Sequence, residues 1–200
     1  MDIYTKLNKI KKIKNSVVTI GAFDGVHVGH MEVLKKLKEI GENKKLPLAI
    51  LTFDPHPQVL LGNKNHKVLM TRDDKLNIFE KLEIDYVFFI PFDENLIKIS
   101  AYEFLNDYIV DKFNPTDVVI GYDHRFGFKR EGDIEFLKKY RLKYNYEIHQ
   151  AECKQINSIN ISSSNIKKIL NNGDIENANL FLGYNYKING LVVKGNGKGR

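Results

Sequence analysis

The chain has 200 residues, of which 42% are apolar and 28% charged, and it carries a single cysteine. This composition is typical of one soluble globular domain, excludes a disulfide framework and contains no apolar run long enough to span a membrane. The lysine-rich N-terminus lacks the apolar core of a secretory signal, so we expect the protein in the cytoplasm. The formal net charge of +6 favours polyanionic partners, either nucleic acid or phosphorylated small molecules.

Residues 16–30 (SVVTIGAFDGVHVGH) predict a buried strand, a glycine turn and the start of a helix. The first turn of a helix presents unpaired backbone N–H groups, so small side chains in the turn create an anion site. His27 and His30 fall at this helix start, where both imidazoles can donate to phosphate oxygens. Two other interpretations are weaker: a zinc site, which the remaining histidines and Cys153 do not obviously complete, and a purely structural turn.

Residues 46–53 predict a second buried strand, after a helix for which Gly41 is the expected C-cap. Two prolines, Pro55 and Pro57, then end the strand and stiffen the turn around His56. From spacing alone, a rigid loop without a ligand is as good an interpretation as a binding wall. Residues 59–67 predict a loop with Gly62 at a turn.

Further strands are predicted at residues 86–90, 117–121 and 144–151, and helices start near Thr71, Ser100 and Asp133. Ser100 and Glu103 form a capping-box pattern. Strands that alternate with helices of this length indicate right-handed crossovers and a mainly parallel, doubly wound α/β sheet of five strands. Ligands of such sheets bind beyond the carboxyl ends of the strands, where the winding reverses.

Two more segments combine polar chemistry with turn residues. Residues 121–127 (GYDHRFG) place a charged cluster and an aromatic ring between glycines, which suits either a surface loop or the wall of a pocket. Ser162, Ser163 and Ser164 can cap a helix whose first turns carry Lys167, which suits either a plain cap or a second phosphate site. The basic residues of 138–143 are best explained as a solvated helix face, so nucleic-acid binding remains the weaker alternative.

Four motifs together resemble those of the bacterial FMN adenylyltransferases (FAD synthetases), a branch of the HxGH nucleotidyltransferase superfamily. GAFDGVHVGH at 21–30 is similar to the signature GxFDGxHxGH, and TFDPHP (52–57), GYDHRFG (121–127) and ISSSNIKK (161–168) follow in the family's order. The resemblance covers essentially the whole chain. It implies a Rossmann-like fold with the first and fourth of the predicted strands adjacent, so that their loops face one crevice.

The resemblance also implies roles for individual residues. His27 and His30 would be catalytic, and the ATP site would comprise Gly21, Ala22, Phe23, Asp24, Gly29, Ser162, Ser163, Ser164 and Lys167. The FMN site would comprise Phe53, Pro55, His56, Pro57, Asp123, Arg125 and Phe126. Departures from the family pattern include Ser164 in place of Thr, Lys167 in place of Arg, His124 in place of an aromatic residue such as Phe, and the lack of an aromatic residue near Leu61. Lysine lacks the planar fork of arginine, which predicts a looser hold on the triphosphate.

The implied reaction transfers AMP from ATP to FMN and yields FAD and pyrophosphate, with Mg²⁺ carried on the triphosphate and no metal site built from protein side chains. The alternatives are nucleotidyl transfer to another phosphorylated small molecule, or a non-catalytic nucleotide- or nucleic-acid-binding relative. Residues 1–183 are expected to form the transferase domain. Residues 184–200 are expected to form a linker and the start of a riboflavin kinase module that is not completed, so no kinase activity is expected from this chain alone.

Overall fold

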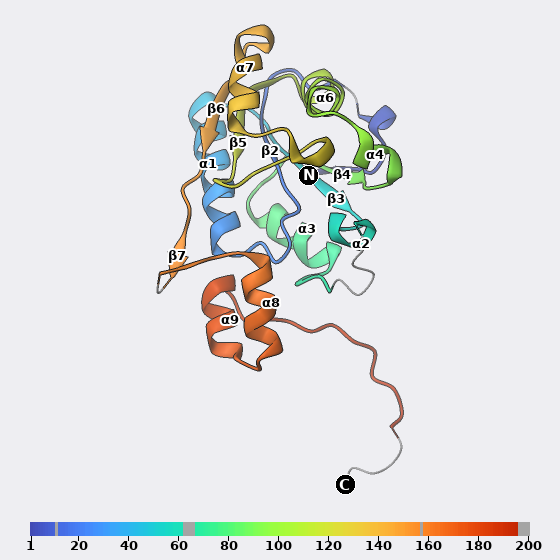
Figure 1. Ribbon diagram of the computed structural model, residues 1–200, viewed down its shortest axis with the longest axis vertical. Helices are drawn as coiled ribbons and strands as arrows, with labels where there is room; N and C mark the ends of the chain where they lie inside the picture. Colours follow the sequence, from blue (N-terminus) through green and yellow to red (C-terminus); the bar gives the residue numbers. More distant parts are fainter. Residues whose placement is uncertain (11, 62–66, 157, 196–200) are drawn as a thin grey trace.

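A computed structural model describes residues 1–10, 12–61, 67–156 and 158–195. Six strands form one parallel sheet in the order β1-β4-β3-β2-β5-β6 (Figure 1). Their bounds are β1 Asp2–Tyr4, β2 Ser16–Ile20, β3 Leu48–Asp54, β4 Tyr86–Pro91, β5 Pro115–Ile120 and β6 Glu147–Gln150. A short antiparallel ribbon follows, made of β7 Gln155–Ile156 and β8 Ile159–Asn160.

The parallel doubly wound sheet and the adjacency of β2 and β5 are confirmed, but the predicted number of five strands is wrong. The additional strand is β1, which pairs with β4 at the edge of the sheet through Asp2 opposite Tyr86. Its three residues are exposed or half-buried, so it lacks the run of buried apolar residues by which the other strands are recognised. The winding reverses between β2 and β5, which makes the carboxyl ends of these two strands the expected ligand crevice.

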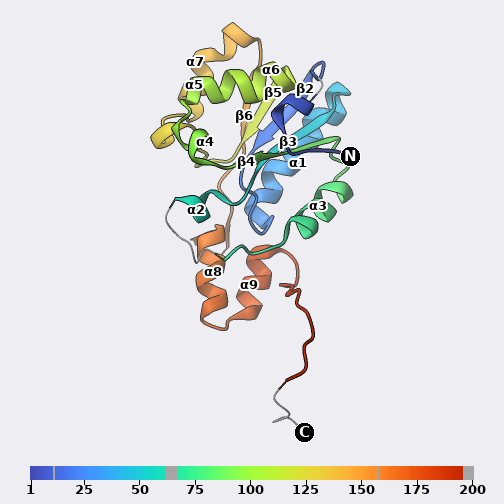
Figure 2. The same ribbon diagram turned by 90° about the vertical axis from the view of Figure 1, so that its right-hand side faces the viewer.

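The helices surround the sheet on two faces and at one edge (Figures 1 and 2). The capping box of Ser100 and Glu103 is confirmed, and the helix that it starts is π-helical in its middle. The α-helices are α1 Val28–Lys44, α2 Pro57–Leu60, α3 Arg72–Lys81, α4 Glu94–Lys98, α5 Ala101–Glu103, α6 Asp111–Phe113, α7 Ile134–Tyr144, α8 Ser163–Asn171 and α9 Ile175–Leu182. Three further helical segments are η1 Leu7–Lys9, the π-helix η2 Phe104–Val110 and η3 Phe128–Arg130.

Alternate residues of β2 supply two separate apolar cores. Val18 and Ile20 pack in the cluster that includes the apolar residues of α4 to α7. Val17 packs in the second cluster, with Leu34 of α1 and Phe79 of α3. The sheet is therefore covered on both faces, as parallel sheets require.

The end of α1 differs from the prediction that Gly41 is its C-cap. The helix continues to Lys44, and Lys45 takes the left-handed conformation that closes it. Gly41 instead lies buried against the next strand, because a Cβ at this position would approach Leu48 Cδ2 to 2.2 Å. The glycine thus permits close packing of helix on strand.

The pair α8–α9 lies beyond the carboxyl edge of the sheet, close to the start of α1, and residues 190–195 lead away from it (Figures 1 and 2). Its apolar residues, including Ile166, Phe181 and Leu182, form a third core with Leu69. Ser162 caps α8 as predicted, and Asp174 caps α9. The predicted turn at Gly62 and residues 196–200 of the predicted linker lie outside the described residues. In the part of the chain that the structure describes, no helix is long and apolar enough to cross a membrane.

Candidate active site

The loop between β2 and α1, residues 21–27, has an unusual backbone. Phe23 and Val26 both have positive φ, at +47° and +32°, and Gly25 has a φ of +84°. Positive φ is costly for a bulky or β-branched residue, so the surrounding structure must stabilise this conformation. Phe23 contributes by burying its ring against Phe79, at a centroid distance of 5.9 Å.

Side chains from distant elements bind the carbonyl groups of this loop. The Lys75 ammonium of α3 donates to the Ala22 carbonyl at 2.7 Å, and the Thr52 hydroxyl of β3 donates to the same oxygen at 3.2 Å. The Ser163 hydroxyl of α8 donates to the Asp24 carbonyl at 2.8 Å. Burial lowers the pKa of Lys75 to about 8, against the opposing effects of nearby carboxylates. The loop is therefore held in place from three elements of the fold.

The Asp24 carboxylate is 2% exposed and has two partners. One oxygen accepts from the Leu69 amide at 2.7 Å, and the other lies 2.6 Å from the Lys167 ammonium of α8. A buried carboxylate with an amide and an ammonium as partners serves as a structural anchor. Asp24 therefore ties the loop to α8.

His27 and His30 lie together at the start of α1. The Nδ1 atom of His27 accepts from the His30 backbone amide at 3.2 Å and so caps the helix, which leaves the ring proton of neutral His27 on Nε2. The two rings stack with centroids 3.6 Å apart and planes 13° apart. Burial lowers the pKa of His27 to about 4 and, together with the positive fields of His27 and Lys75, depresses the pKa of His30 well below its ordinary value. Both imidazoles are therefore neutral hydrogen-bond donors at physiological pH.

A cleft of about 610 Å³ opens over this helix start and brings the two predicted phosphate segments together. Its volume is in the range of small-molecule sites. A Cβ on Gly29 would approach the His27 ring to 3.3 Å, so a glycine at this position leaves the space beside the ring open. The residues that line the cleft are Ala22, His27, Gly29, His30, Val33, His56, Gln58, Gly121, Tyr122, Asp123, Arg130, Glu152, Lys154, Ile161, Ser162, Ser163, Ser164 and Lys167.

The serine-bearing end of α8 forms the opposite side of the cleft. Ser162 caps the helix by accepting from the Asn165 amide at 3.2 Å, Ser163 binds the loop carbonyl described above, and Ser164 is exposed. All three line the cleft with Lys167. The N-termini of α1 and α8 therefore share one cavity, and the backbone amides of both helix ends favour an anion there.

The residues predicted for FMN are divided among the cleft, the interior and the exposed surface. His56 and Asp123 line the cleft, and the His56 Nδ1 atom caps α2 by accepting from the Gln58 amide at 3.2 Å. Phe53 is half-buried and packs edge-to-face on Phe92 at 5.6 Å. Pro55 follows a cis peptide bond and is exposed, and Pro57 is the first residue of α2.

The loop after β5 shows the same division. Phe126 is 6% exposed and packs between Phe104 and Phe136, while Arg125 is exposed and pairs with Asp133 at 2.9 Å. The His124 ring stacks on Phe126, and its Nε2 atom is buried without a hydrogen bond to any described residue. Phe126 and Arg125 lie outside the lining of the cleft, so Asp123 is the member of this loop's predicted set that faces it.

Several lining residues were not predicted. Glu152 and Lys154 follow β6, and Arg130 follows the loop after β5, so all three come after the carboxyl ends of strands. That position is the signal that could have identified them. Within the described ranges, no group of three or more His, Cys, Asp and Glu residues is arranged to hold a metal ion.

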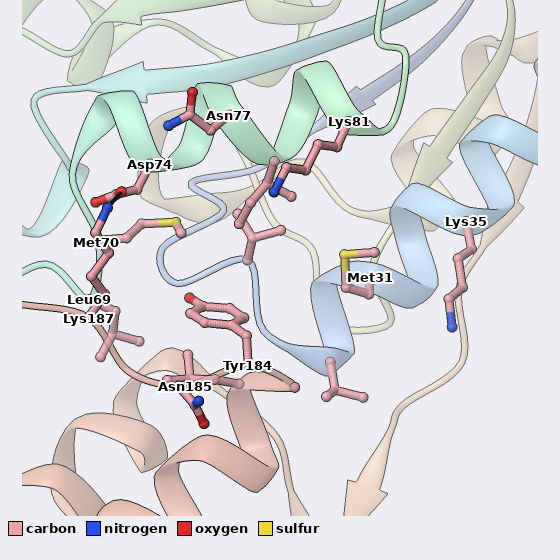
Figure 3. A pocket seen from close by; sticks show the side chains of 15 residues that line it. Met31, Lys35, Leu69, Met70, Asp74, Asn77, Lys81, Tyr184, Asn185 and Lys187 are labelled. Atoms are coloured by element: carbon pink, nitrogen blue, oxygen red, sulfur yellow. Dashed lines mark hydrogen bonds and ion pairs between the residues drawn. The ribbon is translucent and has the colours of Figure 1, made fainter.

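A second cavity, of about 600 Å³, lies on the other side of the loop, between α3, the start of α1 and the residues after α9. Its lining is mainly apolar and includes Met31, Met70 and the ring of Tyr184, with lysines at its margin (Figure 3). The Tyr184 hydroxyl donates to the Gly25 carbonyl. The cleft over the start of α1 and this second cavity are thus separated by the loop of residues 21–27.

The parallel sheet, the winding reversal beside β2 and the paired histidines at a helix start define a nucleotidyltransferase-like α/β protein. The family model described as FAD synthetase matches residues 9–165. The chain belongs to the FAD synthetase family.

Its relatives include proteins named bifunctional riboflavin kinase/FMN adenylyltransferase. The protein from Buchnera aphidicola subsp. Schizaphis graminum is 37% identical over 203 residues, which cover all of this chain and 65% of the relative. Those from Listeria monocytogenes and Escherichia coli K12 are 38% and 33% identical and are each covered to 59% of their length, with 93% and 92% of this chain aligned. This chain therefore spans about three fifths of the relatives that it matches.

Two solved structures resemble the fold. A protein from Streptococcus pneumoniae described as a macrolide-efflux protein has a TM-score of 0.83 at 23% identity, covering 92% of this chain and 70% of its own. Pantothenate synthetase from Thermus thermophilus has a TM-score of 0.51 at 12% identity, covering 92% of this chain and 81% of its own. At these identities the likeness concerns the fold alone.

Proposed function

We propose that this chain is an FMN adenylyltransferase, which transfers AMP from ATP to FMN and releases pyrophosphate. The observation that carries the proposal is the shared cleft, in which the stacked His27 and His30 rings and the serine-bearing end of α8 face the same cavity. The names of the relatives support FMN as the acceptor and FAD as the product.

In the proposed reaction, a phosphate oxygen of FMN attacks the α-phosphorus of ATP in line. The new bond joins that oxygen to the α-phosphorus, and the bond from the α-phosphorus to the bridging oxygen breaks as pyrophosphate leaves. No protein nucleophile is required, because positioning and charge stabilisation account for most of the catalysis of such transfers.

His27 and His30 would bind the α- and β-phosphates as neutral donors. Hydrogen bonds from their ring N–H groups would stabilise the charge that develops on the phosphates. The Ser163 backbone amide, the Ser164 hydroxyl and Lys167 would hold the β- and γ-phosphates. The Ser163 hydroxyl itself donates to the Asp24 carbonyl. The ammonium of Lys167 would then be shared between the triphosphate and Asp24, which it contacts at 2.6 Å.

The residues present fit a magnesium ion that arrives on ATP better than one held by the protein alone. Asp24, the carboxylate of the loop, is already bound by the Leu69 amide and Lys167. Mg²⁺ commonly keeps water and phosphate oxygens as ligands, and when bound it would neutralise part of the triphosphate charge.

We further propose that residues 1–183 form the transferase domain and that residues 184–200 begin a linker toward a riboflavin kinase module. The relatives carry both activities in their names and are longer than this chain. Riboflavin, which lacks the attacking phosphate, would then not be a substrate of this chain.

The test is incubation with ATP, magnesium and either FMN or riboflavin, followed by chromatography of the products. We expect FAD and pyrophosphate from FMN, and neither product from riboflavin. A parallel incubation with nicotinamide mononucleotide examines another phosphorylated acceptor. Pyrophosphate release with that acceptor but not with FMN would refute the assignment of FMN and retain the nucleotidyl transfer.

A further inference from the structure

Residues 184–189, here termed the strap, directly follow α9 and contact the catalytic domain at several points. Gly183 ends α9 in the left-handed conformation, with a φ of +80°, and turns the chain back toward the loop. The Tyr186 amide then donates to the Asn179 side chain at 2.7 Å, which fixes the strap to α9. The sequence alone assigned this segment to a linker.

The first contact of the strap with the loop is made by Tyr184. Its hydroxyl donates to the Gly25 carbonyl, and its ring lines the second cavity (Figure 3). Gly25 has positive φ, and a Cβ there would approach Leu69 Cδ1 to 2.7 Å, so the turn has little room to shift. Burial raises the pKa of Tyr184 to about 12, which keeps the hydroxyl protonated as a donor.

The second contact reaches the loop through α3. Lys187 and Asn189 bind the two oxygens of Asp74 at 2.7 and 2.9 Å. The next residue along α3 is Lys75, whose ammonium holds the Ala22 carbonyl at 2.7 Å. The strap therefore fixes one end of the loop directly and adjoins the anchor of the other end.

These contacts explain how the loop keeps its strained backbone conformation. The carbonyl groups of Ala22, Asp24 and Gly25 each accept a hydrogen bond from a side chain of a different element. A backbone with two non-glycine residues at positive φ persists only when its surroundings stabilise it. Of these three anchors, Tyr184 is the one that follows α9.

We propose that the strap is a positioning element of the phosphate-binding loop, with Tyr184 as its principal positioning residue. The proposal rests on the proposed function, because the loop is taken to place His27 against the phosphates. The proposal adds residues 184–189 to the part of the chain that is needed for nucleotidyl transfer. Through these contacts, the segment that follows α9 is joined to the phosphate-binding loop.

The experiment compares Tyr184→Phe with Tyr186→Phe. Both changes remove one hydroxyl from the same segment, and the Tyr186 hydroxyl has no hydrogen bond to the described residues. For Tyr184→Phe we expect a fall of about 10-fold in kcat for FAD formation, with the KM for FMN changed less than about 2-fold, since one hydrogen bond is removed away from the substrates. Tyr186→Phe should retain the parent kcat.

Hydrogen exchange gives a measurement that does not depend on turnover. Amides of residues 21–27 should exchange about 10-fold faster in Tyr184→Phe than in the parent or in Tyr186→Phe. If the parent makes no FAD, the proposed function fails and the exchange data alone decide the role of the strap. Equal exchange and equal kcat in the two variants would overturn the proposal.

Discussion

The residues predicted to bind phosphate, here termed the phosphate half, and those predicted to bind flavin, the flavin half, differ in how their side chains are held. In the phosphate half, polar groups are buried and fixed by specific partners, as Asp24 is by the Leu69 amide and Lys167. In the flavin half, the predicted aromatic residues Phe53 and Phe126 are packed into a cluster around Phe104. One half is thus ordered by hydrogen bonds and ion pairs, and the other by apolar packing.

This difference indicates that the two sets of residues have different roles in the proposed reaction. Preorganised donors aimed at a developing charge stabilise a transition state, which requires the fixed geometry of the phosphate half. A flat acceptor needs a rigid wall, which aromatic packing supplies, and a few polar groups that fix its orientation. Changes in the phosphate half should therefore lower kcat, and changes in the flavin half should mainly affect stability and FMN affinity.

The largest effect is expected from His30→Ala. Removing a neutral donor to the α- or β-phosphate should lower kcat by about 10²- to 10³-fold, the range found for single donors to a developing oxyanion. The KM for FMN should change little, because the lost interaction strengthens in the transition state. Initial rates of FAD formation at varied FMN measure both quantities.

The control for His30→Ala is His149→Ala. His149 binds the buried Asp117 at 2.7 Å and does not line the cleft, so its loss should leave kcat within about 2-fold of the parent. Thermal unfolding of both variants checks that they fold. A His30→Ala enzyme that keeps a rate within a few fold of the parent would remove His30 from the mechanism.

A smaller effect is expected from Lys167→Ala. Loss of one ammonium should lower kcat/KM for ATP by about 10- to 100-fold, as for hydrogen bonds to charged groups. Lys168→Ala is the matched control, because Lys168 is the adjacent residue of α8 but is exposed and does not line the cleft. The contrast is measured by steady-state kinetics with ATP varied.

Lys167→Ala should also lower the Tm, because it leaves the buried Asp24 without its counter-ion. The double variant Asp24→Asn/Lys167→Ala removes that charge as well. It should recover much of the stability without recovering the rate. Recovery of both would show that Lys167 acts only through the fold, and the phosphate half would lose one of its ligands.

The sequence predicts the phosphate half better than the rest because its signals are local. Glycines, a capping serine and histidines at a helix start identify the loop before α1 and the end of α8 from neighbouring residues alone. The contacts that join these pieces are not local: Ser163 and Asp24 are separated by 139 positions, and Tyr184 and Gly25 by 159. Periodicity and turn chemistry contain no information on such pairs.

For the flavin half, the sequence pattern does not predict whether a side chain lines a pocket or lies in the core. An aromatic residue between glycines has the same pattern whether its ring lines a pocket or fills a core. Phe126 is buried because Gly132 and Ala101 allow its loop to close against α5, and Gly127 packs so tightly on Ala101 that a Cβ would approach its backbone to 2.6 Å. Only the assembled fold decides between the two interpretations.

The smallest effect is expected from His124→Phe, which tests whether the flavin half is held by packing. The His124 ring stacks on Phe126, and burial, with a smaller effect of Arg130, lowers its pKa to about 4. The unfolded chain, with a histidine pKa near 6.5, binds more protons between pH 6.5 and 4, so the parent loses stability as the pH falls through this window. A phenylalanine does not titrate and also removes a buried nitrogen that has no partner among the described residues.

We therefore expect the Tm of His124→Phe to exceed that of the parent by about 2–5 °C at pH 5 and by a smaller amount at pH 8. Differential scanning calorimetry at the two pH values measures the gap. A gap that is the same at both would mean that His124 titrates alike in the folded and unfolded chains. FMN affinity should stay within about 3-fold of the parent, because removal of an interior ring nitrogen acts through packing rather than contact. A large loss of FMN binding would instead place His124 among the groups that recognise the flavin, and the division between the two halves would no longer hold.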